Sequence, residues 1–234
     1  MPSIWNFYGQ GNGDRLIDPT NYPPDVASFL LEEERLLERL VESFSILVEV
    51  GCMTGRFLDW AIERDKKYIG IDVVERYIQA GNDEILSRKL SQDLYQFRLG
   101  SAEDLSSVLK DKLQKADADK LLLFFPFNSI GNMPAVESVI QSLKQCNLRF
   151  VISTYLTDEK SNASRADYYN RCKYLNVQLV QNAQGVCFKS DDGLQSIAYH
   201  PLYFRQLCLA NSLAIASISF SEIGIAYLLT SEKI

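Results

Sequence analysis

Between residues 45 and 156 the sequence alternates short apolar runs with amphipathic stretches, and this alternation limits the fold more than any other feature. The apolar runs are SILVEVG, KKYIGID, YQFRLGS, LLLFFPF and LRFVISTYL, and a stretch with helical spacing follows each of the first four. Apolar strands that alternate with helices are typical of a parallel sheet covered on both faces. The pattern therefore predicts an α/β fold with a doubly wound, mostly parallel sheet.

The segments on either side of this core have other patterns. Residues 1–23 are rich in glycine, proline, asparagine and aromatics, which predicts a loop or lid rather than a regular element. Pro24 begins an amphipathic helix expected over 24–43, and its charged residues, among them Glu33, are expected on the outer face. After residue 156 we expect a helix, then two or three antiparallel strands within 175–199, a helix from Pro201 and a closing hairpin around Gly224.

Composition narrows the class of partner. The chain has 234 residues, a net charge of −6 and a pI near 5.0, so nucleic acid is not expected as the main partner, because phosphate binding needs a basic surface. The sequence has neither a secretory signal pattern nor an apolar run of about 18 residues, so no membrane span is expected. The five cysteines are scattered and His200 is the single histidine, which predicts buried thiols in a reducing cytoplasm and no metal site.

The stretch VEVGCMTG indicates a bound ligand. Its apolar run contains Glu49 and ends at Gly51, Gly55 follows four residues later, and Asp72 ends the next apolar run. Doubly wound sheets bind ligands at the carboxyl ends of their strands, where glycine lets the backbone approach and an acid after the second strand accepts from ribose hydroxyls. Two alternatives stay open: Glu49 as an internal cap or ion-pair partner, and Asp72 as a helix N-cap.

The glycine pattern separates two families of nucleoside-binding proteins. The NAD fingerprint G-x-G-x-x-G is absent. The run resembles the first motif of the class I S-adenosylmethionine-dependent methyltransferases, acidic-x-Gly-x-Gly-x-Gly, with Met53 in place of the middle glycine. In that family the acid lies near the amino-acid portion of the cofactor, the glycines line its sulfonium and ribose, and an acid after the second strand holds the ribose. Glu49, Gly51, Gly55 and Asp72 match these positions.

Two later stretches extend the resemblance. GSAEDL, residues 100–105, stands where the family places its adenine-contacting turn, and FPFNSIGNM, residues 125–133, stands where it keeps residues nearest the transferred group. The resemblance implies S-adenosyl-L-methionine as cofactor and a binding domain over 24–234 that follows the lid at 1–23. Within this domain it implies an inserted substrate cap over about 157–200. The implied cofactor-binding set is Glu49, Gly51, Cys52, Met53, Gly55, Asp72, Val73, Ser101, Ala102, Glu103 and Phe125.

A reaction at a sulfonium needs a nucleophile aligned with the electrophilic carbon more than it needs a strong base. The carbonyl oxygen of Asn128 can accept a hydrogen bond from an attacking amine, and aromatic faces attract a sulfonium or ammonium. His200, the single histidine, is a candidate general base, and the alternative role is simply to begin the last helix. The catalytic candidates are Asn128, Tyr8, Tyr22, Tyr155, Tyr168 and His200.

The sequence is compatible with three functions. The first is an S-adenosylmethionine-dependent enzyme that methylates a small metabolite at nitrogen or oxygen. The second is the reaction of relatives such as azetidine-2-carboxylate synthases, in which the amino group of the cofactor attacks its own side chain and releases methylthioadenosine. The third is a non-catalytic nucleoside-binding protein. The sequence indicates neither the substrate nor the oligomeric state.

Overall fold

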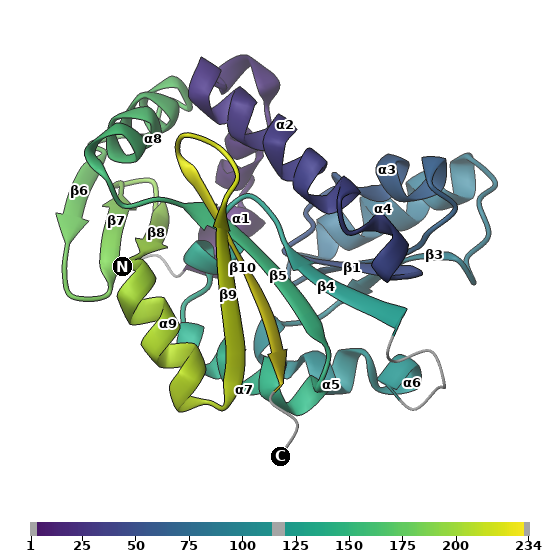
Figure 1. The fold of residues 1–234 in the computed structure, drawn as a ribbon. Helices are drawn as coiled ribbons and strands as arrows, with labels where there is room; N and C mark the ends of the chain where they lie inside the picture. Colours follow the sequence, from purple (N-terminus) through teal and green to yellow (C-terminus); the bar gives the residue numbers. More distant parts are fainter. Residues whose placement is uncertain (1–3, 114–119, 232–234) are drawn as a thin grey trace.

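The computed structural model describes residues 4–113 and 120–231. A seven-stranded sheet lies at its centre, with strand order β3-β2-β1-β4-β5-β10-β9 (Figure 1). Strands β1 to β5 pair in parallel, and β10 pairs antiparallel with β5 and β9. The strands are β1 (Ile46–Val50), β2 (Lys67–Asp72), β3 (Tyr95–Leu99), β4 (Leu121–Phe125), β5 (Arg149–Tyr155), β9 (Leu213–Ser219) and β10 (Gly224–Ser231).

Helices cover both faces of this sheet. Alternate side chains of β1 explain the two layers, because Val48 and Val50 enter one apolar cluster and Leu47 enters the other. One layer contains α2 (Pro24–Glu38), α3 (Leu58–Glu63) and α4 (Glu75–Ser87). The other contains α5 (Leu105–Val108), α7 (Val136–Cys146) and α9 (Pro201–Ala210). The predicted doubly wound sheet with a closing antiparallel hairpin is confirmed.

The strand order reverses between β1 and β4. Neighbouring strands β2 and β3 lie to one side of β1, whereas β4 and β5 lie to the other. The segments that follow β1 and β4 therefore diverge from adjacent strand ends, which is the position where doubly wound sheets bind ligands.

A second, three-stranded antiparallel sheet lies at one end of the molecule, beside α8 (Glu159–Arg171) (Figure 1). Its strands are β6 (Gln178–Gln181), β7 (Gly185–Lys189) and β8 (Gln195–Tyr199). The buried side chain of Arg165 joins helix to sheet, because its guanidinium donates to the carbonyls of Val186 and Ser196.

The N-terminal segment differs from the predicted loop. It forms α1 (Ile4–Gly9) and two 3-10 turns, η1 (Asn12–Leu16) and η2 (Pro19–Asn21); residues 1–3 of the predicted lid lie outside the described residues. Phe7 and Leu16 are buried in a third apolar cluster with residues of α2, α8 and the second sheet. Glycine and proline content indicated a loop, but tertiary burial of these two side chains organises the segment.

Two of the expected helices also differ in extent. The helix expected over 24–43 ends at Glu38 and is followed by a 3-10 turn, η3 (Val41–Ser43). The helix expected over 103–114 is divided into η4 (Ala102–Asp104), α5 and α6 (Lys110–Leu113), and residue 114 lies outside the described part. Helix α4 is continuous through Gly81, where glycine is needed because a Cβ would lie 2.5 Å from the Phe97 ring. No helix within residues 4–113 and 120–231 is long and apolar enough to span a membrane.

Candidate cofactor site

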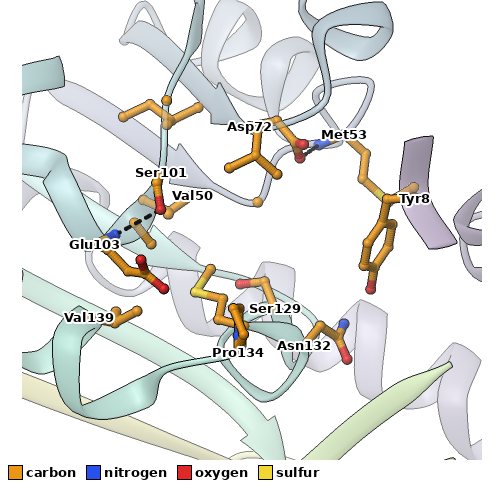
Figure 2. Close-up of a pocket in the computed structure, with 16 residues that line it drawn as sticks. Tyr8, Val50, Met53, Asp72, Ser101, Glu103, Ser129, Asn132, Pro134 and Val139 are labelled. Atoms are coloured by element: carbon orange, nitrogen blue, oxygen red, sulfur yellow. Dashed lines mark hydrogen bonds between the residues drawn. The ribbon is translucent and has the colours of Figure 1, made fainter. Parts of the chain in front are cut away.

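A cavity lies at the carboxyl ends of β1, β2 and β3, beside the loop after β4 (Figure 2). The cavity and its open mouth together hold about 620 Å³ of empty space. Its walls are mainly apolar. The lining residues are Tyr8, Val50, Gly51, Met53, Ile71, Asp72, Val73, Gly100, Ser101, Ala102, Glu103, Ser129, Asn132, Met133, Pro134 and Val139.

The turn after β1 forms one wall. Gly51 has φ 76°, which favours glycine, and a Cβ on it would lie 2.9 Å from the Cβ of Ser129 in the loop after β4. Gly51 and Cys52 both donate their backbone N–H to the carbonyl of Ile71, which fixes the turn to β2. The close approach of the two loops therefore requires glycine at position 51.

Asp72 lies at the end of β2 and is 8% exposed. One carboxylate oxygen accepts from the backbone N–H of Met53 at 2.9 Å and the other from that of Val74 at 3.0 Å. Burial raises the pKa of the Asp72 carboxyl, while these backbone donors favour the ionised form. A carboxylate has about four acceptor sites, so Asp72 can brace the turn and still accept bonds from a ligand. The helix-cap alternative is wrong, because the N-cap residue of α4 is Val74 and no side chain caps the helix; Asp72 lies two residues earlier and accepts from the N–H of Val74.

The turn after β3 supplies a second wall. Gly100 donates its N–H to the carbonyl of Asp72, and the hydroxyl of Ser101 accepts from the N–H of Glu103 at 3.2 Å. Ala102 is buried, with Ser101 and Glu103 on either side of it in the cavity wall. Figure 2 shows Ser101 and Glu103 at one end of the cavity and Tyr8 at the other.

Two polar atoms of the loop after β4 have no hydrogen-bond partner within the described residues. They are Oγ of Ser129 and Oδ1 of Asn132, both buried and both from residues that line the cavity. These residues belong to η6 (Ser129–Asn132), which lies across the cavity from Asp72 in Figure 2. Buried polar atoms in native proteins are almost always paired, and both residues line the cavity, so a bound polar group or an ordered water there would supply the missing partners.

Comparison with known proteins assigns the chain to a family. Residues 43–206 match a family described as methyltransferase domain. The chain belongs to this family. The resemblance to the class I S-adenosylmethionine-dependent methyltransferases is confirmed, and with it the enzyme class and its cofactor. A search of curated proteins found no match.

Solved structures of methyltransferases share the fold. The 1,6-didemethyltoxoflavin-N1-methyltransferase of Burkholderia thailandensis, solved with 1,6-didemethyltoxoflavin and S-adenosylhomocysteine, is 10% identical with a TM-score of 0.61, covering 100% of this chain and 92% of that chain. The magnesium protoporphyrin IX methyltransferase of Synechocystis, solved with S-adenosylhomocysteine, is 10% identical with a TM-score of 0.61 and 98% coverage of both chains. A [4+2]-cyclase is 12% identical with a TM-score of 0.55, covering 86% and 82%.

The methyltransferase cavity has a further wall that comes from the N-terminal segment. Tyr8 is half-buried and packs so closely on Gly13 that a Cβ there would lie 2.3 Å from its ring. Burial, reinforced by Tyr169 and Asp72, raises the pKa of the Tyr8 hydroxyl far above its ordinary value, so this group stays neutral. The segment is anchored by Arg76, which donates to the carbonyl of Tyr8 and to Asp14.

Four members of the predicted cofactor-binding set lie outside the cavity lining. Glu49 is 1% exposed and accepts from the N–H of Phe57 at 3.2 Å and the hydroxyl of Tyr68 at 2.6 Å, so it braces the start of α3. Burial raises its pKa to about 7, an effect that the two hydrogen bonds oppose. The other three are Cys52 and Phe125, buried in the two main apolar clusters, and Gly55, where a Cβ would lie 2.5 Å from the Phe97 ring. Their predicted contact with the cofactor stays a prediction that this placement does not support.

Most predicted catalytic side chains also lie elsewhere. Asn128 is 1% exposed, donates to the hydroxyl of Ser196 at 3.1 Å and accepts from Thr154. It lines a second, smaller cavity together with Tyr155 and Tyr168, not the cofactor cavity. Because Asn128 follows the fourth strand, the sequence predicts that it faces the same crevice as Gly51 and Asp72; this prediction is wrong, because these hydrogen bonds direct its amide toward β5 and β8. Catalytic roles for these three residues remain untested predictions.

The last two candidates have structural contacts. The Tyr22 ring packs edge-on against Phe127 and Tyr168, and burial raises its pKa to about 12. His200 is the residue before α9, and its Nδ1 lies 3.0 Å from the hydroxyl of Thr157. Within the described residues no group of three or more histidine, cysteine or acidic side chains could hold a metal ion.

Sequence reasoning missed several lining residues. Ser129, Asn132 and Met133 stand in the stretch that the family resemblance marked as nearest the transferred group, and Pro134 follows it directly, but the resemblance did not say which side chains line the cavity. Phe127 and Asn128 both have positive φ, 47° and 58°, and this left-handed pair turns the chain so that the residues after it reach the cavity. Neither of these two residues is glycine, so the sequence gives no signal for this change of chain direction.

Proposed function

We propose that the protein transfers the methyl group of S-adenosylmethionine to a nitrogen or oxygen of a small metabolite, with both molecules bound in the cavity beside Asp72. The observation that carries this proposal is that Ser129 and Asn132, each with a buried oxygen that has no hydrogen-bond partner within the described residues, line the same cavity as Asp72. A carboxylate at one wall and free acceptors at the other match a ligand with hydroxyl groups at one end and a second N–H or O–H donor near the other.

The residues of the cavity suit the cofactor. Asp72 would accept hydrogen bonds from the ribose hydroxyls, and Gly51 leaves room for the ligand against the backbone. Ser101 and Ala102 would edge the adenine, with Glu103 as an acceptor for its amino group. Met53 narrows the cavity where the family has glycine and offers a soft apolar contact there.

Asn132, Ser129 and Tyr8 would form the end of the cavity that binds the methyl-accepting substrate. The cofactor, when bound, supplies a methyl group already activated on a sulfonium. The carbonyl oxygen of Asn132 would accept a hydrogen bond from the substrate nitrogen or oxygen that receives the methyl group. This bond would orient the lone pair of that substrate atom toward the methyl group. The neutral Tyr8 hydroxyl can donate or accept, while its ring excludes water. Because such a reaction needs orientation more than a base, the absence of His200 from the lining is no obstacle.

The flanking segments would control access. We propose that residues 1–23, through Tyr8, act as a lid, and that the insert at about 157–200 acts as a cap that shapes the acceptor side. A net charge of −6 favours a small-molecule partner over nucleic acid. The free, buried cysteines agree with a reducing, cytoplasmic location.

The nucleoside product tests the proposal directly. The protein is incubated with S-adenosylmethionine alone and with fractionated small metabolites, and the products are separated by chromatography. S-adenosylhomocysteine that forms only with a metabolite fraction supports methyl transfer. Methylthioadenosine formed without any fraction would replace the proposal by the internal displacement, and tight binding without either product would leave a non-catalytic nucleoside-binding protein.

A further inference from the structure

Glu33 occupies a position that apolar residues fill on the rest of its helix. The buried face of α2 carries Val26, Phe29, Leu36 and Leu37, and Glu33 lies in the same stripe with 0% exposure. The expectation that it lies on the outer face is wrong, because positions 29, 33 and 36 share one side of a helix. A fully buried carboxylate is costly unless its oxygens are paired.

The two oxygens of this carboxylate have different partners. Oε1 accepts from the backbone N–H of Phe127 at 2.6 Å and also from the hydroxyl of Ser153 on β5. Oε2 pairs with the guanidinium of Arg56, which also donates to the carbonyl of Leu30 at 2.8 Å. Phe127 begins the loop after β4, and Arg56 belongs to the turn after β1. Residues of both segments line the cofactor cavity.

Phe127 begins the loop whose later residues carry the two unpartnered oxygens. Its φ of 47° is unfavourable for a side chain with a Cβ, and Asn128 follows with φ 58°. The chain therefore enters η6 through two strained residues in succession. Glu33 holds the N–H of the first, and the carbonyl of Ser153 accepts from the N–H of the second at 3.0 Å. Both anchors stand at the entrance to the stretch that contains Ser129 and Asn132.

Arg56 belongs to the opposite wall. It follows Gly55 in the turn after β1, and its guanidinium lies over the Phe57 ring at 4.6 Å. That turn presents Gly51 and Met53 to the cavity, and it touches the other loop where Gly51 approaches Ser129. One carboxylate thus binds both segments that face each other across the cavity. Helix α2 lies outside the residues matched to the methyltransferase family, 43–206.

We infer that Glu33 is a positioning residue that holds the turn after β1 and the loop after β4 at a fixed separation across the cofactor cavity. Its effect on the cofactor rests on the proposed function. Its effect on the two segments does not, since it can be measured in the protein without any ligand.

Amide hydrogen exchange followed by mass spectrometry reads the two segments separately. In Glu33→Leu, peptides covering 52–58 and 126–133 should both exchange at least tenfold faster, because Arg56 and the N–H of Phe127 lose their partner. Glu33→Gln keeps an oxygen for Phe127 and Ser153 but loses the charge opposite Arg56, so only the peptide over 52–58 should change. Arg56→Met should reproduce the Glu33→Gln pattern.

Leu36→Ala is the matched control. Leu36 lies on the same buried face of α2, and its truncation loosens the core without removing a hydrogen bond to either segment. It should lower the melting temperature and leave exchange in both peptides within twofold of wild type. Calorimetry with S-adenosylhomocysteine should show at least tenfold weaker binding for Glu33→Leu and a change below twofold for Leu36→Ala.

The outcomes separate the two claims. Wild-type protein that does not bind S-adenosylhomocysteine overturns the proposed function, whereas the exchange data still decide the role of Glu33. Unchanged exchange in both peptides of Glu33→Leu, or an equal increase throughout the chain, would show that Glu33 has no specific positioning role. If Glu33→Leu does not fold, selective exchange at 52–58 in Glu33→Gln decides the same question, and a pattern there that matches Leu36→Ala overturns the inference.

Discussion

The cofactor cavity and the neighbouring aromatic cluster contain similar residue types but differ in how their polar atoms are paired. The aromatic cluster consists of Tyr22, Phe29, Phe127, Tyr155, Tyr168 and Tyr169, packed between α2, α8 and the segment after β4. Both regions border the same loop. Two residues that line the cavity have unpartnered oxygens, whereas two of the four tyrosine hydroxyls in the cluster donate to the protein itself.

The pairing in the aromatic cluster is internal. Tyr168 donates to the carbonyl of Leu16, Tyr169 donates to the hydroxyl of Ser196 at 2.9 Å, and that hydroxyl also accepts from Asn128. Tyr155 alone among these rings has a buried hydroxyl without a partner. The internal hydrogen bonds of Tyr168, Tyr169 and Asn128 therefore account for these polar side chains without a ligand.

The largest expected effect is on stability and comes from the aromatic cluster. Phe29 is fully buried, and its ring centre lies 5.0 Å from that of Tyr155 and 4.9 Å from that of Phe220. Phe29→Ala should lower the free energy of unfolding by about 3 to 5 kcal/mol, measured by urea denaturation. The folded fraction should bind S-adenosylhomocysteine within threefold of wild type. A tenfold loss of affinity instead would join the cluster to the cofactor site.

Glu49 provides a pH test beneath the cavity. Its pKa is raised from 4.5 to about 7 by burial, so between these values the folded state holds a proton that the unfolded state has released. Stability should therefore fall as pH rises from about 4.5 to 7, by about 3 kcal/mol, and stay constant above that. Glu49→Gln keeps an acceptor for Phe57 and Tyr68 and should lose this slope. Glu63→Gln, an exposed change on α3, controls for the loss of one charge.

Asp72 tests the cavity itself. Removing a charged acceptor from a ribose should cost about 1.5 to 3 kcal/mol of binding free energy, so Asp72→Ala should weaken S-adenosylmethionine binding more than tenfold by calorimetry. Because the carboxylate also braces Met53, the circular dichroism spectrum and melting curve must show a folded protein. Unchanged affinity in a folded Asp72→Ala variant would contradict the placement of the cofactor in this cavity.

A pair of asparagines compares the two regions directly. Asn132→Ala removes an unpartnered oxygen from the cavity, so it should reduce turnover about tenfold, roughly 1.4 kcal/mol in the barrier, with little change in melting temperature. Asn128→Ala removes a partner of Thr154 and Ser196 and should cost about 1 to 3 kcal/mol of stability. Its turnover per folded molecule should stay near wild type. The reverse result would restore Asn128 as the residue that aims the nucleophile.

The contrast also shows what the sequence could predict. The periodicity of the strands and helices was sufficient to predict the sheet, because a continuously apolar strand must be covered by helices on both faces. Motif spacing was sufficient for Gly51, Asp72 and the turn at 100–103, since these follow directly from strand ends. It was insufficient for Asn132, because a left-handed backbone pair decides which side chains of that loop face inward. It was also insufficient for Glu33, which stands in a run of charges that reads as solvated.

The smallest expected effect concerns the anchor of the N-terminal segment. Arg76 on α4 donates to both carboxylate oxygens of Asp14, at 2.5 and 3.1 Å, and to the carbonyl of Tyr8 at 3.1 Å. The ion pair lowers the pKa of Asp14 below its ordinary value, although burial opposes this shift. Both side chains are nearly half exposed, and exposed pairs contribute only about 0.2 to 1 kcal/mol.

Arg76→Ala should therefore weaken S-adenosylhomocysteine binding only two- to threefold, through looser placement of Tyr8. The wild-type affinity should fall with added salt more steeply than that of Arg76→Ala, because salt screens the exposed pair. Arg88→Ala is the matched control, since Arg88 caps the other end of α4 and pairs with Asp59, away from the N-terminal segment. If both variants bind alike at every salt concentration, then the cavity keeps its Tyr8 wall without this ion pair, and the aromatic cluster alone holds the segment in place.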